Sequence, residues 1–336
     1  MAQEQMNTAL RDLAPGERFC GVYLLKSAQT GVTSTGKPYL SFRLADLTGE
    51  LPGKAWDYAG PLGGGDAGQS VWVRGRVELY QNAPQAALEE IRLTDERDEV
   101  DPARFVPAAP HDPEKMLAYV RKTLEGLEDA DYRTVCLAVL DRRQDAFAAL
   151  PGGKTMHHSF RHGLLMHTAN MMRQAAGLAR IYADVIDRSL LIAGAFLHDI
   201  GKLSEYATSQ LGLVSDYSRE GQLLGHLFLG AEEVGSTARA LGIAEEKTLL
   251  LQHLIVSHHG RAEFGAVVPP KCAEAELLAN IDMIDSRMEI FREALADTAP
   301  GQFSKQRVYG QYNSFLYRHS EAGEPSPTTD AHGVSL

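Results

Sequence analysis

Alternation of apolar and polar positions marks the front of the chain, from about residue 17 to residue 97. Short segments with this period of two are separated by glycine- and proline-containing turns, a pattern typical of antiparallel β-strands. The five predicted strands cover 19–32, 39–47, 49–57, 70–80 and 86–94. The alternation predicts two inward-facing sets, Leu40, Phe42 and Leu44 and then Val71, Val73, Val77 and Leu79.

Five strands in a segment of this length suit an OB-type β-barrel. The outward positions of the predicted strands mix aromatic and basic residues, the side chains with which OB folds stack bases and contact the phosphates of single strands. The candidates for substrate binding are Tyr39, Arg43, Trp72, Arg74, Arg76 and Tyr80. Such residues are exposed on most β domains, and residues 1–100 hold more acids than bases, so a purely structural role stays open.

The composition changes after the predicted barrel. Residues 98–112 are rich in proline and charge and lack periodicity, which predicts a linker. Within 113–317, apolar residues recur at spacings of three and four, which predicts helices. The seven predicted helices cover 112–127, 131–150, 162–182, 189–200, 222–241, 245–259 and 273–295. The tail, 318–336, has little to bury and is expected to be disordered.

Length and composition agree with a multi-domain α and β protein, a barrel in 1–97 followed by an all-α bundle. A chain of 336 residues exceeds one ordinary core, and 44% hydrophobic with 23% charged residues is typical of soluble globular proteins. No apolar run approaches the roughly 20 residues of a membrane helix. The N-terminus has no secretory pattern and the three cysteines are far apart, so we expect a cytoplasmic protein without membrane contact. A net charge of -11 restricts nucleic-acid contact to local surfaces.

Histidines concentrate in the predicted helical domain. Nine of the twelve lie between residues 157 and 259. A single histidine is most often an ordinary core or surface residue, but divalent transition metals take neutral imidazole and carboxylate ligands. Because a helix bundle can direct side chains inward from several helices, the cluster predicts a metal site.

His198 and Asp199 end an apolar helix, where a desolvated carboxylate is costly unless a partner compensates it. A metal ion would do so. Gly201 permits a tight break, and Lys202 then lies where an ammonium group can hold a phosphate oxygen. The alternative is that this segment is only a helix exit. We therefore predict Asp199 and Lys202 as catalytic residues.

Three further residues lie on other predicted helices. His167 is surrounded by apolar positions, which predicts an inward side chain, and Asp282 and Asp285 share one helix face. For Asp285 the alternatives are a cap or an ion pair with Arg287.

The order of a histidine, a His-Asp pair and a final aspartate resembles the HD superfamily of metal-dependent phosphohydrolases. A further histidine and a His-His pair resemble its expanded form, in which a second metal is bound and the aspartate of the pair bridges both ions. The ligands that this implies are His167, His198, Asp199, His226, His258, His259 and Asp282. The cofactor is expected to be one or two divalent ions, Mn²⁺ first, with Mg²⁺, Fe²⁺ or Co²⁺ as alternatives. Two ions would clamp the attacking water and the leaving oxygen at phosphorus.

The combination of motifs is more specific than the HD pattern. The predicted barrel is followed by the segments HHSFRHGLLMHT, HDIGK, EGQLLGH, VSHHG and IDMIDSRM. In this order of segments, the chain resembles the YhaM-type 3′→5′ exoribonucleases over residues 15–300. The resemblance implies an enzyme that removes nucleotides one at a time from single-stranded RNA, with single-stranded DNA as a second polymer. His158, four residues before His162, is a candidate substrate contact, with a helix cap as the alternative. The roles of His157, His162 and Asp285 stay open.

Two other functions remain alternatives. One is an HD phosphohydrolase of small nucleotides or cyclic dinucleotides, with the OB domain as a regulatory module. The other is a non-enzymatic single-strand or DNA-element binding factor with a structural HD site. The sequence leaves open the identity and number of metals, the choice of RNA or DNA, the partner of the OB domain, and whether the chain forms a homo-oligomer.

Overall fold

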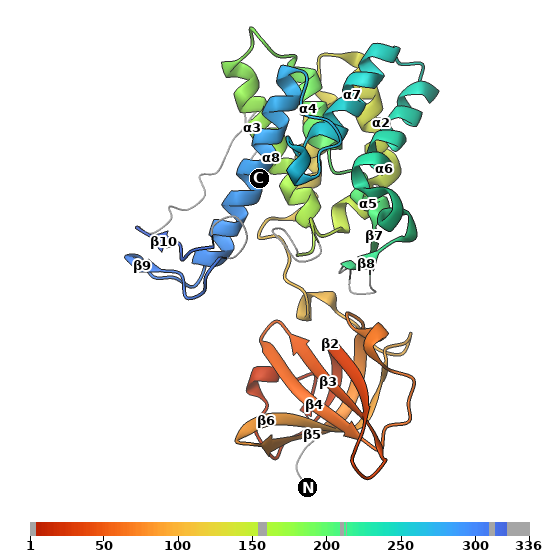
Figure 1. The fold of residues 1–336 in the computed structure, drawn as a ribbon, viewed down its shortest axis with the longest axis vertical. Helices are drawn as coiled ribbons and strands as arrows, with labels where there is room; N and C mark the ends of the chain where they lie inside the picture. The colour runs from red at the N-terminus through yellow and green to blue at the C-terminus, as the bar shows by residue number, and fades with distance from the viewer. Residues whose placement is uncertain (1–4, 154–159, 209–211, 213, 309–312, 321–336) are drawn as a thin grey trace. The chain divides into compact units, whose positions relative to one another are not determined.

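The computed structural model describes residues 5–153, 160–208, 212, 214–308 and 313–320. The chain forms two compact units (Figure 1). The first comprises Met1–Ala108 and Ala207–Asp216, and the second comprises Ala109–Tyr206 and Tyr217–Leu336.

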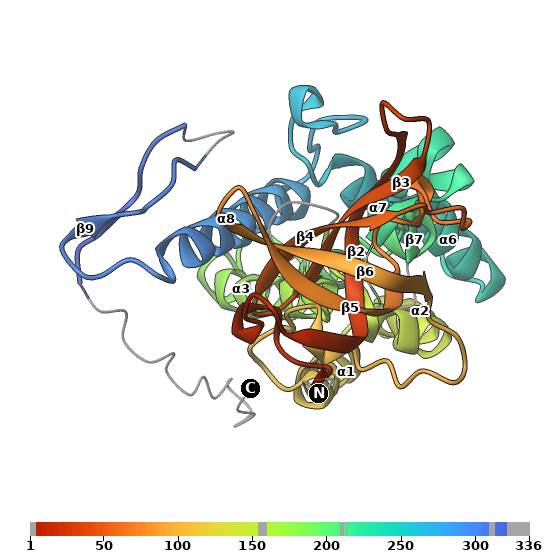
Figure 2. The same cartoon turned by 90° about the horizontal axis from the view of Figure 1, so that it is seen from below.

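The first unit is built on a closed barrel of five strands (Figures 1 and 2). These are β2 (Arg18–Val32), β3 (Pro38–Asp46), β4 (Gly49–Trp56), β5 (Ser70–Tyr80) and β6 (Ala83–Leu93). The sheet order is β1-β2-β3-β4-β6-β5, with β1 (Gln5–Met6) at one edge, and the β2–β5 pairing closes the barrel. β4 and β6 pair in parallel, whereas the other barrel strands pair antiparallel. The predicted OB-type barrel is confirmed.

The barrel interior follows the predicted alternation with one exception. Leu40, Phe42, Leu44, Val71, Val73 and Val77 are buried in one apolar cluster. The prediction for Leu79 was wrong, because this side chain is 60% exposed. Leu79 pairs with Pro84 close to the turn between β5 and β6, where the hairpin has left the barrel. Periodicity fixes the face of a residue but not where the covering layer ends.

Helices dominate the second unit, and the seven predicted ones are present. They are α1 (Pro113–Glu125), α2 (Ala130–Ala149), α3 (Gly163–Ile181), α4 (Arg188–Leu197), α6 (Arg219–Ala240), α7 (Glu245–Ser257) and α8 (Ala273–Leu295). Short elements that periodicity missed include α5 (Lys202–Glu205), the paired strands β7 (Tyr206–Thr208) and β8 (Val214–Tyr217), which lie mostly in the first unit, and the pair β9 (Gln302–Phe303) and β10 (Tyr317–Arg318). Among the helices described, none has the length and apolarity to cross a membrane.

Helix α4 determines where the bundle places its polar residues. Asp187 caps its N-terminus, because the side chain accepts hydrogen bonds from the backbone N–H groups of residues 189 and 190. All its residues from 189 to 197 are buried. At Gly194 a Cβ atom would lie 2.2 Å from a methyl carbon of Leu254, so α4 and α7 pack closely here. Because α4 is covered on all sides, the residues that follow its last turn also lie in the interior.

Candidate metal centre

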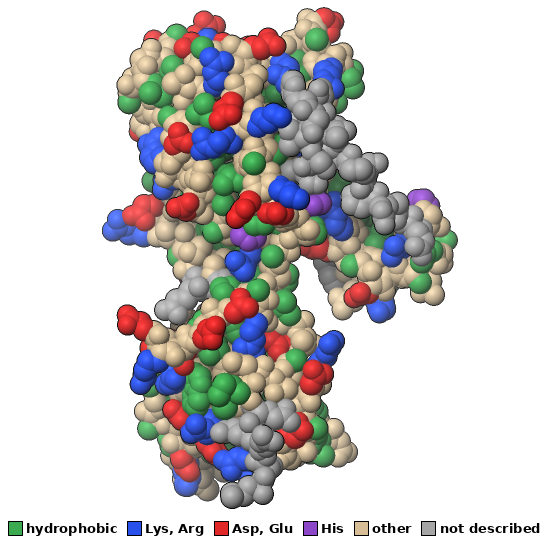
Figure 3. Space-filling view, turned by 180° about the vertical axis from the view of Figure 1, so that it is seen from behind, with side chains coloured by type: hydrophobic (Ala, Val, Ile, Leu, Met, Phe, Trp, Pro, Cys, Tyr) green, Lys and Arg blue, Asp and Glu red, His purple; other side chains and the backbone are tan. Residues whose placement is uncertain are grey.

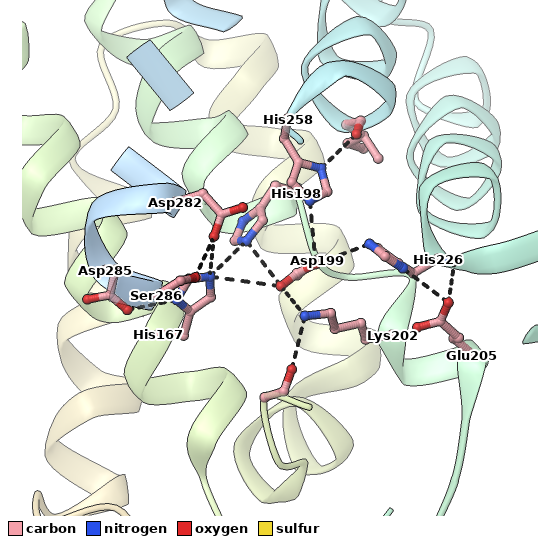
Figure 4. A network of polar contacts seen from close by, with 12 residues as sticks. His167, His198, Asp199, Lys202, Glu205, His226, His258, Asp282, Asp285 and Ser286 are labelled. Carbon is pink, nitrogen blue, oxygen red and sulfur yellow. Dashed lines mark hydrogen bonds and ion pairs between the residues drawn. The ribbon is translucent and has the colours of Figure 1, made fainter. Parts of the chain in front are cut away.

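Three side chains from three elements form the first group of possible metal ligands (Figure 4). His167 comes from the first turns of α3, His198 follows α4, and Asp282 comes from the middle of α8. The Nε2 atom of His167 lies 3.2 Å from Nε2 of His198 and 3.3 Å from Oδ1 of Asp282. Two ring nitrogens and a carboxylate oxygen therefore point toward one position.

A second group consists of His226 on α6 with His258 and His259 at the end of α7. His258 is buried, and the other two are partly covered.

Asp199 lies between the two groups (Figure 4). Its Oδ2 atom is 3.2 Å from Nε2 of His198, on the side of the first group. Its Oδ1 atom is 3.6 Å from Nε2 of His226 and 3.7 Å from Nε2 of His258, on the side of the second. Each carboxylate oxygen thus faces a different set of histidines, which suits a bridging ligand.

Four of these histidines are held through the ring nitrogen that faces away from the site. The Nδ1 partners are Asp285 Oδ2 for His167 at 2.8 Å, Ala195 O for His198 at 3.0 Å, Ile255 O for His258 at 2.7 Å, and Glu205 Oε1 for His226 at 3.1 Å. All four partners are acceptors, so they favour the tautomer with the proton on Nδ1. The Nε2 lone pair then points into the site, as a metal ligand requires.

The unpaired atoms at the centre fit a divalent cation. Asp199 Oδ1, His226 Nε2 and His259 Nδ1 are buried and have no hydrogen-bond partner in the part of the chain that the structure describes. Distances of 3.6 and 3.7 Å are too long for hydrogen bonds. They suit ligand atoms that share one ion, each at ~2.0–2.2 Å. The donor set of imidazoles and carboxylates is the set that transition metals take.

Burial and charge set the protonation of the ligands. Burial lowers the pKa of His258 well below its usual range, which favours the neutral ring that binds metals. Burial would raise the pKa of Asp199, but Lys202 and His198 hold it well below its usual range. Burial would likewise lower the pKa of His167, yet Asp282 and Asp285 raise it to about 10. A metal ion at Nε2 of His167 would take the place of that proton.

Lys202 lies against the carboxylate of Asp199. Its Nζ atom is 2.7 Å from Oδ2 of Asp199 and 3.0 Å from the carbonyl oxygen of Gly152. Burial lowers the pKa of Lys202, but Asp199 raises it above its usual range, so the ammonium group stays charged. Gly201 lets the chain pass close to α6 just before Lys202, because a Cβ atom at Gly201 would lie 2.0 Å from the carbonyl oxygen of His226.

Tyr39 and Trp72, two of the aromatic candidates of the barrel, lie in separate places. Tyr39 pairs with Trp56, with ring centroids 5.6 Å apart, and the Lys54 ammonium lies 5.0 and 4.9 Å from the two centroids. Trp72 is half-buried and packs against a cluster containing Phe105 and Val106 from the predicted linker. On β2, the register partners of Tyr39 and Trp72 are residues 31 and 22, nine positions apart. The two aromatic sites are thus far apart along that strand.

The basic candidates of the barrel have carboxylate partners. Arg43 pairs with Glu50 at 3.3 Å, Arg74 with Glu90 at 3.8 Å, and Arg76 with Glu78 at 2.6 Å. The face in Figure 3 likewise shows Lys and Arg side chains interspersed with Asp and Glu. A phosphate would have to compete with these glutamates. Tyr80, the last candidate, is 58% exposed next to the β5–β6 turn.

Of the histidines near α3, His162 has a local contact. Its Nδ1 atom is 2.6 Å from the carbonyl oxygen of Ala148, and its backbone has a φ of 65° at the start of α3. His157 and His158 lie outside the described residues.

With the geometry established, comparison with known proteins decides the family. A family model described as "HD domain" matches residues 164–287. The curated 3'-5' exoribonuclease YhaM of Halalkalibacterium halodurans is 35% identical over 308 residues, which cover 90% of this chain and 93% of that protein. The protein of the same name from Listeria monocytogenes is 35% identical over 314 residues, covering 93% and 98%. The chain belongs to the YhaM family of 3'-5' exoribonucleases.

Solved structures add little to this YhaM-family assignment. The second OB-fold domain of replication protein A from Methanococcus maripaludis matches 30% of this chain and 100% of that chain, at 16% identity and a TM-score of 0.21. The OB assignment depends on the strand order of the barrel.

Sequence analysis missed one residue of this YhaM-family site altogether, and the function of another stayed open. Glu205 accepts hydrogen bonds from both the backbone N–H and the ring Nδ1–H of His226. The backbone N–H is available because the helix is interrupted at Gly225, which has a φ of 71°. Asp285 has the corresponding place beside His167. Glu205 lies six residues after Asp199, and no periodicity in the sequence indicated that its side chain is buried beside His226.

We expect Glu205→Ala to weaken one metal site selectively. Without its acceptor, His226 can rotate or change tautomer, so the affinity of the second ion should fall about 10–100-fold while the first ion stays bound. Calorimetric titration with Mn²⁺ measures this. Glu233→Ala is the matched control, because Glu233 is also a poorly exposed glutamate of the second unit but pairs with Arg143. Equal metal binding by both variants would contradict the role of Glu205.

Proposed function

We propose that this chain is a metal-dependent 3′→5′ exoribonuclease that hydrolyses single-stranded RNA to nucleoside monophosphates, as its YhaM relatives are named. The observation that carries the proposal is Asp199, whose two buried oxygens face separate histidine groups. Two ions held across one carboxylate would suit in-line displacement at phosphorus. We further propose Mn²⁺ as the cofactor and the cytoplasm as the location. The proposed domains are the OB-type domain 1–97, the linker 98–112, the HD domain 113–317 and the tail 318–336.

The proposed ligands form two sets, one for each metal ion. His167, His198 and Asp282 would hold one ion, and His226, His258 and His259 the other, with Asp199 shared. Bound ions supply Lewis acidity and an activated water.

Lys202 would contribute directly to substrate binding. An ammonium group has three N–H donors, and two of them are directed at Asp199 and at the carbonyl group of Gly152. The third can donate to a phosphate oxygen and stabilise charge that develops there. The described geometry does not require a covalent intermediate.

The barrel would bind nucleotides of the RNA that lie on the 5′ side of the cleaved bond. Exposed Trp56 with Tyr39 forms a surface on which bases can stack, and Lys54 adds a cation beside it. Trp72 is a weaker candidate because the segment containing Phe105 and Val106 packs on it. Arg43, Arg74 and Arg76 would bind phosphate groups of the RNA in place of their glutamate partners.

The test uses short single-stranded RNA labelled at either end, with Mn²⁺ present. With a 5′ label we expect a ladder that shortens by single nucleotides, and with a 3′ label immediate release of labelled mononucleotide. A DNA strand of the same sequence, run in parallel, measures the preference between polymers. Intact RNA combined with hydrolysis of a cyclic dinucleotide would instead favour a small-nucleotide phosphohydrolase.

A further inference from the structure

A cavity of about 460 Å³ opens directly onto the candidate metal centre. Its lining includes His258, His259, Asp282, Phe264, Met283 and Arg287. Three of these are proposed metal ligands, and the others have no role in the metal centre itself. The volume lies within the roughly 300–1,000 Å³ of small-molecule pockets, enough for one nucleotide unit.

One wall of the cavity is a single face of α8. Ala279, Asp282, Met283 and Ser286 recur at spacings of three and four and therefore lie on one side of the helix. Ser286 donates a hydrogen bond to Oδ1 of Asp282 at 3.3 Å, so its hydroxyl group is already directed at a ligand. The thioether of Met283 lies beside this polar end and is suited to contact with an aromatic ring. The wall thus offers a carboxylate, a hydroxyl group and an apolar thioether to the same cavity.

Phe264 contributes to the cavity lining from a segment outside α8. It ends the short 3₁₀ helix η4 (Ala262–Phe264), five residues after His259, and its side chain is 57% exposed. Gly265, with a φ of 101°, follows it, and a Cβ atom there would lie 3.2 Å from Nδ1 of His259. The turn therefore packs against a ligand histidine and holds Phe264 in the cavity lining.

We infer that this cavity is the subsite for the 3′-terminal nucleoside of the substrate, and that Phe264 is the side chain on which its base stacks. The inference rests on the proposed function. The phosphate of the terminal nucleotide would lie at the end with Asp282 and the histidines, and the base at the end with Phe264 and Met283. Arg287 adds a guanidinium group to the same lining, suited to phosphate oxygens.

This assignment has two consequences for specificity. Stacking needs an unpaired base, so a 3′ end in a duplex cannot enter. Every base has a face that can stack, so the subsite accepts all four bases.

The decisive experiment removes the Phe264 side chain and the 3′-terminal base, first separately and then together. Wild type and Phe264→Ala are each given single-stranded RNA with an ordinary 3′ nucleotide and the same RNA with an abasic 3′ residue. For wild type, kcat/KM should be about tenfold to hundredfold lower on the abasic end, the loss expected for one stacked base. For Phe264→Ala, kcat/KM should be lowered to that level on both substrates, because the two losses share one contact.

Control variants separate stacking from damage to the fold or the metal site. Phe303→Ala removes a phenylalanine of similar exposure, 62%, outside the cavity, and should behave as wild type. Phe264→Trp should keep the discrimination between the two substrates, and Mn²⁺ titration should give the same affinity for Phe264→Ala as for wild type.

The possible failures are distinguishable. If wild type degrades both RNAs with the same kcat/KM, the subsite does not hold the terminal base, while the nuclease function stands. If wild type discriminates and Phe264→Ala discriminates equally, the base binds in the site but does not stack on Phe264. If wild type removes no nucleotide from either RNA, the proposed function fails and the subsite falls with it.

Discussion

Replacing Asp199 with asparagine should reduce RNA hydrolysis by about 10³-fold or more, because a carboxylate that held metal ions at the proposed site would contribute several kcal/mol of transition-state stabilisation. Asparagine keeps the shape of the side chain but loses the charge. The Oδ2 and Oδ1 atoms of Asp199 face separate histidine groups, so the change weakens both. Single-turnover rates with end-labelled RNA, together with metal analysis of the purified variant, measure the effect. RNA binding, followed by fluorescence anisotropy, should be retained.

The control for this variant concerns Lys202. Its ammonium group is poorly exposed and loses its counter-charge in Asp199→Asn, which should cost about 3–5 kcal/mol of stability. The double variant Asp199→Asn with Lys202→Met removes both charges, so it should recover stability but not activity. Chemical denaturation distinguishes the two proteins. Full activity of Asp199→Asn with metal bound would show that the carboxylate does not take part in hydrolysis.

Much of the site could be predicted because its ligands follow simple rules. An apolar run from residue 189 to 197 requires a buried helix, and the residues directly after that helix must be buried with it. His198 and Asp199 therefore had to be either compensated or functional. The other ligand candidates lie on helices with clear periodicity, and the structure brings all seven together. Their assignment as metal ligands remains a prediction.

The supporting contacts could not be predicted, because they depend on breaks in regular structure. Glu205 reaches His226 through a four-residue helix after Gly201 and a kink at Gly225. Neither break has a periodic signal.

The barrel shows the same limit. The alternation placed Trp72 on the outside correctly, but it carried no information about the segment that covers this residue. Phe105 and Val106 lie in a stretch whose proline and charge indicated a linker, yet both are buried. Side-chain periodicity describes a strand, and the partner of its outer face comes from tertiary packing.

Removal of the metal should abolish hydrolysis and lower the melting temperature, and Mn²⁺ should restore both. Without ions, Asp199 Oδ1 and the ring nitrogens of His226 and His259 stay unpaired in the interior. An ion at about 1,000 times its dissociation constant stabilises the folded chain by about 4.1 kcal/mol. Differential scanning calorimetry with chelator and then with Mn²⁺ measures the shift, and Asp199→Asn should respond less. Equal melting temperatures, with full activity in chelator, would contradict a metal centre.

Protons released when the metal binds give a second measurement of the same centre, and the pKa shifts predict where release occurs. In the metal-free protein Asp282 and Asp285, against the opposing effect of burial, raise the pKa of His167 to about 10, so the ring is protonated near neutral pH. Burial lowers the pKa of His258, so that ring is already neutral. Binding at the first group should therefore release a proton, while His258 in the second group should release none. Titrations in buffers of different ionisation enthalpy count these protons. Because the proton competes with the ion at His167, affinity at the first group should rise with pH and level off only above about pH 10.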